Sequence, residues 1–291
     1  MERAEPGNRL TKLRALAVAC HLPPSLAVTA VATALALDVG RGRSSIWVAL
    51  AVLAGQLSVG WSNDALDAER DQLAARRAKP IVAGLVSRRL VALCALGALV
   101  LCVPLSLASG WRAATVHLIA VALAWTYNLG LKATRASVLP YALAFGLLPA
   151  FVTLGLAGSP WPKPVVMVVA GLLGVGAHFV NTIADVDDDA LTGVRGLPQR
   201  LGPEVSLRAG VLFLALAALG IGALGLESSG SSRHGPLTLL LVIAALLVDG
   251  AVFVAAHREH GRVAWYGTLA SAGLCVLAFV TLGSTALLAG S

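Results

Sequence analysis

The chain is short of charged residues. Only 13% of its 291 residues are Asp, Glu, Lys or Arg, whereas 57% are hydrophobic, and its mean hydropathy is +0.82. Soluble domains carry about 25% charged residues. This shortage excludes an ordinary soluble domain and indicates an integral membrane protein.

Cysteine is also scarce. The four cysteines lie in apolar segments without a CxxC or Cys/His pairing, so we expect neither a disulfide nor a zinc site. The net charge of +7 matches the basic excess that orients membrane proteins, and we expect no nucleic-acid partner. The N-terminus is basic, but it lacks a short apolar run ending in a small-residue cleavage site, so we expect no cleaved signal peptide.

What is abundant is apolar sequence. A membrane-spanning helix needs about 20 mostly apolar residues. Nine segments meet this need, near 13–37, 45–62, 89–108, 113–131, 137–157, 164–184, 204–225, 236–256 and 263–288. The sequence therefore predicts an all-α, polytopic membrane protein with about nine transmembrane helices. Pro23 and Pro24 should kink or break the first of them.

The distribution of basic residues predicts the topology. With the N-terminus in the cytoplasm, 17 of the 22 Lys and Arg residues lie inside and 5 lie outside. We expect a multi-pass protein of the plasma membrane with a cytoplasmic N-terminus and an external C-terminus. The two long connections, 63–88 and 185–203, then lie on the cytoplasmic face.

Aspartate is rare and clustered. The chain has nine aspartates, and seven of them fall between residues 63 and 71 or between 181 and 189. The two stretches share one spacing of four, four and nine residues, in Asn63, Asp67, Asp71 and Pro80 and again in Asn181, Asp185, Asp189 and Pro198. Intervals of four place these side chains on one helix face. A solvated acidic helix end is the alternative, but it does not explain two matched copies.

Carboxylates at this spacing repel one another, so a cation must stabilise each set. Oxygen ligands rich in aspartate suit Mg²⁺, which binds through carboxylates and substrate phosphates. The motifs lie four helices apart on one side of the membrane, which resembles a parallel internal repeat. We therefore expect a single domain over 1–291 with pseudo-repeats of about 13–135 and 136–288 around a central cavity that holds a diphosphate.

Three sets of residues are candidates for the site. The candidate Mg²⁺ ligands are Asn63, Asp64, Asp67, Asp71, Asp185 and Asp189, and the five aspartates are the candidate catalytic residues. The candidate diphosphate contacts are Asn63, Arg76, Arg77, Lys79, Lys132, Asn181 and Arg195, since Arg favours bidentate phosphate contacts. The alternative explanation for these basic residues is that they only set the membrane topology, since cytoplasmic loops are rich in Lys and Arg.

The acceptor pocket has weaker candidates. An acid inside a membrane helix is a functional candidate by default, which applies to Asp249. His178 lies one turn before Asn181 on nearly the same face, so it is a second candidate. His21 and His117 are expected to be structural histidines of the helices.

The chain resembles the UbiA superfamily of intramembrane prenyltransferases. Its NDxxDxxxD motif is matched by Asn63, Asp64, Asp67 and Asp71, and its second DxxxD motif by Asp185 and Asp189. Tyr127 followed by Leu131-Lys132 is a further match, which makes Tyr127 a pocket candidate. Lys79-Pro80 replaces the Arg-Pro often found in the family, so the sequence leaves open which of Arg76, Arg77 and Lys79 contacts the diphosphate.

The resemblance implies Mg²⁺-dependent transfer of an isoprenyl group from a prenyl diphosphate to a small acceptor, expected to be aromatic. An allylic carbocation would form in an apolar bundle that excludes water. A terpene cyclase of the same superfamily is a close alternative. A cation- or proton-coupled transporter is an alternative from another class, although transporters place acids nearer the midplane.

Overall fold

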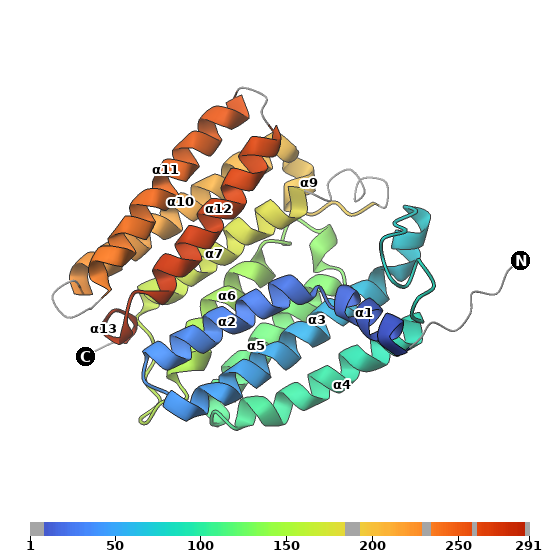
Figure 1. Cartoon of the computed structure of the whole chain (residues 1–291), viewed down its shortest axis with the longest axis horizontal. Helices are drawn as coiled ribbons and strands as arrows, with labels where there is room; N and C mark the ends of the chain where they lie inside the picture. The colour runs from blue at the N-terminus through green and yellow to red at the C-terminus, as the bar shows by residue number, and fades with distance from the viewer. Residues whose placement is uncertain (1–8, 184–192, 229–233, 258–260, 289–291) are drawn as a thin grey trace, which may run out of the picture.

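The protein is a bundle of α-helices (Figure 1). The computed structural model describes residues 9–183, 193–228, 234–257 and 261–288. The helices are α1 (Arg9–Ala19), α2 (Leu22–Asp38), η1 (Gly42–Ser44), α3 (Ser45–Leu73), α4 (Arg88–Leu107), α5 (Trp111–Asn128), η2 (Leu131–Ala133), α6 (Leu139–Thr153), α7 (Pro164–Ile183), α9 (Leu197–Leu201), α10 (Pro203–Ser228), α11 (Gly235–His257), α12 (Gly261–Val280) and α13 (Ser284–Leu287). The β-pairing found within these residues is an isolated bridge between Pro162 and Leu288. The all-α prediction is confirmed.

Each of the nine predicted segments coincides with a helix of the described residues, and the first one is broken as expected. α1 and α2 meet at an angle of 63°. The break lies at His21, which adopts a left-handed backbone conformation with φ 53° and ψ 54°. Pro23 follows in the first turn of α2, where a missing N–H costs no helical hydrogen bond.

The second segment is longer than predicted. We expected it to end at residue 62 and the acidic motif to open a long connection, but α3 continues to Leu73. Its 29 residues rise about 43 Å, whereas the hydrocarbon core is about 30 Å thick. The last turns of α3 therefore project beyond the core and carry the first acidic motif on a rigid helix.

Several helices are long and apolar enough to cross a membrane. Among the described residues these are α3 together with η1, α4, α7, α10 and α11, and the bent pair α1–α2 makes a sixth. Apolar side chains on the outer faces of α4 and α11 are exposed, as in Val100 and Leu247, each with 71% of its surface accessible. The chain is a multi-pass membrane protein whose peripheral helices turn apolar residues outward.

The helices are arranged around α7 and α6. Figure 1 shows α10, α11 and α12 at one end of the bundle and α4 at the other, with α7, α6, α2, α3 and α5 between them. α6 and α7 approach each other closely at Gly171. A Cβ atom at this position would lie only 2.9 Å from the Ala142 carbonyl oxygen, so the absence of a side chain permits the approach. The main apolar core joins these helices and includes Phe151, Leu35 and Leu214.

α1 packs against the projecting end of α3. The indole Nε1 of Trp61 donates a hydrogen bond of 2.9 Å to the Leu16 carbonyl oxygen. A Cβ atom on Gly60 would lie 2.2 Å from the Cys20 carbonyl oxygen, so only glycine permits this approach. The contact places the α1–α2 break, and therefore His21, beside the acidic motif.

Candidate functional site

The first acidic motif lies on the inner side of α3 near its C-terminal end. Asp64 and Asp71 are buried, and the side chain of Asp67 is 14% exposed. Asp64 accepts a 2.5 Å hydrogen bond from Lys79 Nζ, and His21 Nε2 lies 3.4 Å from the same oxygen. The chain therefore returns from the 74–87 connection to place a lysine against the first aspartate.

The other two aspartates have their own cations. Both oxygens of Asp67 accept hydrogen bonds of 2.6 Å from Lys132 Nζ, and Arg70 pairs with Oδ1 of the same carboxylate. Asp71 lies 3.4 Å from Arg76 Nη1 and 4.0 Å from Lys79 Nζ. These cations offset the repulsion that the four-residue spacing creates along α3.

The oxygen atoms of the motif fit Mg²⁺ by type. Asp64 Oδ2 is buried and accepts no hydrogen bond from the described residues. Carboxylate and amide oxygens are the protein ligands of this ion, which usually binds through one or two carboxylates plus substrate phosphates. Within the described residues, no group of three or more His, Cys, Asp and Glu side chains is gathered as a metal cluster. The motif therefore offers part of a coordination shell.

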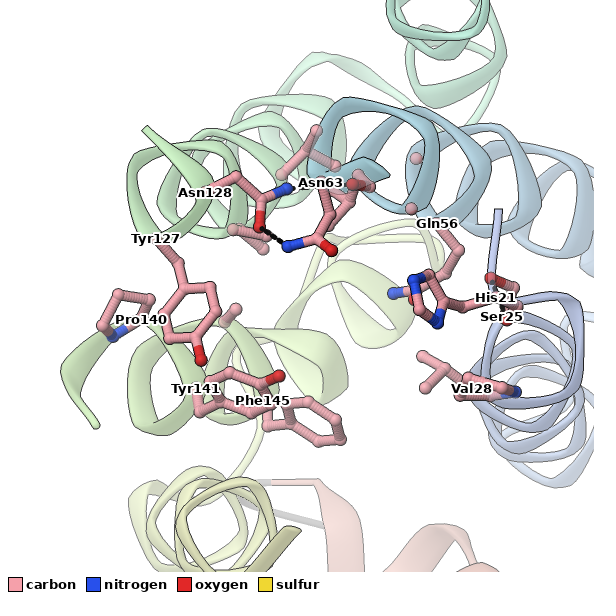
Figure 2. Close-up of a pocket in the computed structure, with 18 of the residues that line it drawn as sticks. His21, Ser25, Val28, Gln56, Asn63, Tyr127, Asn128, Pro140, Tyr141 and Phe145 are labelled. Atoms are coloured by element: carbon pink, nitrogen blue, oxygen red, sulfur yellow. Dashed lines mark hydrogen bonds between the residues drawn. The ribbon is translucent and has the colours of Figure 1, made fainter. Parts of the chain in front are cut away.

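A cavity of about 480 Å³ opens beside the motif. Its lining comes from the α1–α2 break, α3, α5, α6 and α7. Asn63 and Asn181 line it together with apolar residues that include Val28, Val52 and Leu148, and Figure 2 shows Asn63 and Val28 among the lining residues. The acidic motif thus borders the polar end of a mostly apolar chamber, which fits a ligand with a charged head and an apolar tail.

Asn63 is oriented by a residue that the sequence did not reveal. Its Nδ2 donates a 3.2 Å hydrogen bond to Asn128 Oδ1, and Figure 2 shows its oxygen turned toward the cavity. Asn128 is itself fixed, because its Nδ2 donates to the Val59 carbonyl oxygen at 2.9 Å and to Ser62 Oγ at 2.8 Å. The sequence feature that could have indicated Asn128 is its polar amide directly after Tyr127 in a predicted membrane helix.

An aromatic cluster forms the wall between α5, α6 and α7. Tyr127 and Tyr141 line the cavity, and their ring centroids are 5.2 Å apart. His178 packs behind both rings, at 5.7 Å from Tyr127 and 4.7 Å from Tyr141. His178 Nε2 lies 3.2 Å from Ser137 Oγ, which also accepts a hydrogen bond from the backbone N–H of Leu197. Tyr127 thus lines the cavity, whereas His178 supports the wall from outside the lining.

The remaining candidates are spread over different places. Asn181 is exposed at the end of α7 and lines the cavity. Arg77 and Arg195 are exposed, and the side chain of neither forms a hydrogen bond or an ion pair within the described residues. The structure separates Arg77 from Arg76 and Lys79, both of which face the motif.

Two histidines behave differently from one another. His117 was expected to be structural, and its Nδ1 lies 2.8 Å from Ser106 Oγ while its ring stacks on Phe151, although it also lines the cavity. His21 was assigned the same role, but it lines the cavity beside Asp64. The signal for His21 was its position directly before the Leu22-Pro23-Pro24 break.

Asp249 does not line this cavity. It is buried on α11, where Ser271 and Cys275 of α12 are its neighbours. Its role as a possible acceptor-pocket residue stays a prediction. Asp185 and Asp189 lie outside the described residues, so the second acidic motif is represented by Asn181 alone.

Known proteins similar to this chain are found by sequence and by structure. The pattern of the UbiA prenyltransferase family matches residues 22–271. The 33 kDa chain of bacteriochlorophyll synthase from Cereibacter sphaeroides is 31% identical over 196 residues, which is 62% of this chain and 63% of that one. Digeranylgeranylglyceryl phosphate synthase from Methanopyrus kandleri is 30% identical over 186 residues, or 63% of this chain and 66% of that one. The chain therefore spans less than two thirds of the length of these relatives.

Solved structures show the same fold at low sequence identity. A UbiA homologue from Archaeoglobus fulgidus bound to DMAPP and Mg²⁺ aligns with a TM-score of 0.67 and 18% identity, covering 94% of this chain and 98% of that one. The apo structure of a UbiA homologue from Aeropyrum pernix aligns with a TM-score of 0.61 and 22% identity, covering 87% and 96%. With its family pattern matched over most of its length and its fold shared with these structures, the chain belongs to the UbiA prenyltransferase family.

Proposed function

We propose that the protein transfers an isoprenyl group from a prenyl diphosphate to a small acceptor, for which we expect an aromatic ring, in a reaction that requires Mg²⁺. The observation that carries the proposal is that Asn63, the first residue of the motif that Asp64, Asp67 and Asp71 continue along α3, lines a mostly apolar cavity. A prenyl diphosphate has the matching shape, with an anionic head and an apolar tail.

The proposed metal ligands are Asn63, Asp64, Asp67, Asp71, Asp185 and Asp189, with the five aspartates essential for catalysis. When bound, Mg²⁺ would neutralise the negative charge that builds on the diphosphate oxygens. The unpaired Asp64 Oδ2 and the cavity-facing amide of Asn63 support this assignment in the first motif. For the second motif the support is its matched spacing in the sequence.

Basic residues around the motif would hold the diphosphate. Lys79 and Lys132 are the foremost candidates, because each already lies within 2.6 Å of a motif carboxylate. Arg76 is the third, at 3.4 Å from Asp71. Asn181 lines the cavity and can donate from its amide, whereas Arg77 and Arg195 remain candidates from their sequence positions alone.

In the proposed reaction, the allylic C–O bond breaks and its electron pair leaves with the diphosphate. The acceptor supplies the electron pair of the new bond to the allylic carbon and releases a proton to solvent. Tyr127 and Tyr141 face the cavity with aromatic rings, which stabilise a nearby cation and exclude water. The residues of the chain thus bind and orient the prenyl diphosphate and shelter the allylic cation from water.

We also propose that residues 1–291 form one domain of two pseudo-repeats, about 13–135 and 136–288. α3 and α7 correspond in this scheme, since each contributes a matched asparagine, Asn63 or Asn181, to the lining of the cavity. The Lys and Arg distribution supports a plasma-membrane protein with a cytoplasmic N-terminus and a site that opens to the cytoplasm.

The test uses the purified protein in detergent with Mg²⁺, prenyl diphosphates of several lengths and an extract of small aromatic compounds and quinone precursors. Mass spectrometry would detect prenylated adducts and free terpenes, with EDTA and Asp67→Ala as controls. We expect an adduct that requires Mg²⁺ and Asp67. A hydrocarbon formed without acceptor would identify a cyclase instead, and full adduct formation by Asp67→Ala would refute the proposed site.

A further inference from the structure

The cavity has two unlike walls below its polar end. Among the lining residues in the described part of the chain, none is Lys, Arg, Asp or Glu. Figure 2 shows Tyr127, Tyr141 and Phe145 on one side and His21, Ser25 and Gln56 on the other. The cavity therefore pairs an aromatic wall from α5 and α6 with a hydrogen-bonding wall from the α1–α2 break and α3.

Gln56 is the distinctive group of the polar wall. Its half-buried side chain lines the cavity, and no hydrogen bond of this side chain is found within the described residues. Ser25, by contrast, donates to the Cys20 and His21 carbonyl oxygens at 3.1 and 3.2 Å. A glutamine amide offers two donors and an acceptor oxygen. The amide of Gln56 is therefore available to a ligand in the cavity that forms hydrogen bonds.

A prenyl tail forms no such hydrogen bonds. An apolar chain laid over Gln56 would cover the amide and leave its hydrogen bonds unmade, which is unfavourable. The opposite wall accommodates the tail better, because Phe145 and Leu148 continue the apolar surface below Tyr141. The aromatic faces also attract an allylic cation. The tail and the acceptor are thus assigned to opposite walls.

We propose that the wall around Gln56 is the acceptor subsite and that it takes an uncharged acceptor with a carbonyl or hydroxyl group at its inner end. This inference rests on the proposed prenyl transfer. Gln56 precedes Asn63 by seven residues on α3, a distance of about 10 Å along the helix axis. An acceptor that reaches Gln56 while its reacting atom stays at the polar end is therefore about 10 Å long.

The described lining contains no Lys, Arg, Asp or Glu, which favours an uncharged acceptor. A carboxylate at the inner end would be desolvated, because the described lining contains no Lys or Arg and the imidazole of His21 already lies 3.4 Å from Asp64. A carbonyl or hydroxyl requires only a hydrogen bond, which Gln56 provides as donor or acceptor. The subsite consequently selects against acceptors that carry a free acid at their inner end.

The experiment compares Gln56→Met with Gln72→Met in the full-length protein. Methionine keeps the side-chain length without hydrogen bonds, and Gln72 is exposed on the same helix. Two rates are measured with geranyl diphosphate and Mg²⁺. The first is diphosphate release without acceptor, and the second is adduct formation with the acceptor that mass spectrometry identifies in the extract of small aromatic compounds and quinone precursors. The first rate reports the prenyl donor alone, and the second reports the acceptor.

We expect Gln56→Met to raise the half-saturating acceptor concentration about tenfold, equivalent to about 1.4 kcal/mol, and to change that for geranyl diphosphate less than twofold. Gln72→Met should change neither. An acceptor response within twofold of the wild-type value, an acceptor with a free acid at its inner end, or product formation without any acceptor would each overturn the subsite. No Mg²⁺-dependent diphosphate release from wild-type protein would instead refute the proposed function itself. Gln56→Glu, which keeps the shape but adds a charge, should weaken acceptor binding at least as much.

Discussion

Replacement of Lys132 by methionine is the sharpest test of how the first motif works. Lys132 is 8% exposed, and its Nζ donates 2.6 Å hydrogen bonds to both oxygens of Asp67. A hydrogen bond to a charged group contributes about 1.5–3 kcal/mol. If the same ammonium group also contacts the diphosphate, its loss should raise the KM for prenyl diphosphate about 10- to 150-fold.

The folded state should tolerate this change. Asp67 keeps Arg70 as a partner, so the carboxylate is not left without a cation. Removing one member of a fully buried pair costs about 3–5 kcal/mol, and we expect a smaller loss of unfolding free energy here because the Asp67 side chain is 14% exposed.

The assay is Mg²⁺-dependent diphosphate release against prenyl diphosphate concentration, with thermal unfolding in detergent measured alongside. Lys163→Met is the matched control, because Lys163 lies 3.9 Å from Glu227, in a pair whose Glu227 side chain is exposed. Such pairs contribute about 0–1 kcal/mol, so this variant should keep its KM. A folded Lys132→Met variant whose KM and kcat stay within twofold of wild type would refute the assigned role of Lys132.

Three further outcomes are expected. Gly60→Ala should lower the unfolding temperature, because the added Cβ would lie 2.2 Å from a backbone oxygen. Gly97→Ala is the control and should leave the unfolding temperature unchanged, because nothing lies within 4 Å of its added Cβ. Equal unfolding temperatures for the two variants would contradict the close approach of α1 and α3. Asn128→Leu should weaken Mg²⁺-dependent activity severalfold in the wild-type protein, because Asn128 orients the amide of Asn63. The loss should be smaller in an Asn63→Asp background, since a carboxylate has two equivalent oxygens and needs no orienting partner. Equal losses in both backgrounds would count against the orientation of Asn63 by Asn128. EDTA should abolish product formation and added Mg²⁺ should restore it, whereas activity that persists in EDTA would exclude the proposed chemistry.

The sequence predicted the helices well because their signal is local. Apolar runs of about 20 residues and the Pro23-Pro24 pair were enough to place nine segments and one break. The end of α3 was wrong, because polar residues were taken to end a helix that in fact extends beyond the membrane core to Leu73. Arg41 shows the same difficulty, since we counted it as an external topology residue although it is buried and donates to the Val152 carbonyl oxygen and Ser109 Oγ.

The sequence by itself determined the class of environment, the helical segments and the identity of the first acidic motif with its four-residue spacing. These follow from composition and from helical periodicity, which require no knowledge of neighbouring helices. Only the tertiary structure decided that Lys79 and Lys132 pair with particular aspartates, that Arg77 pairs with none within the described residues, and that His21 and Asn128 lie beside the first motif. Those contacts join residues 15 to 65 positions apart in the chain, and these residues meet only when the helices and their connections pack together.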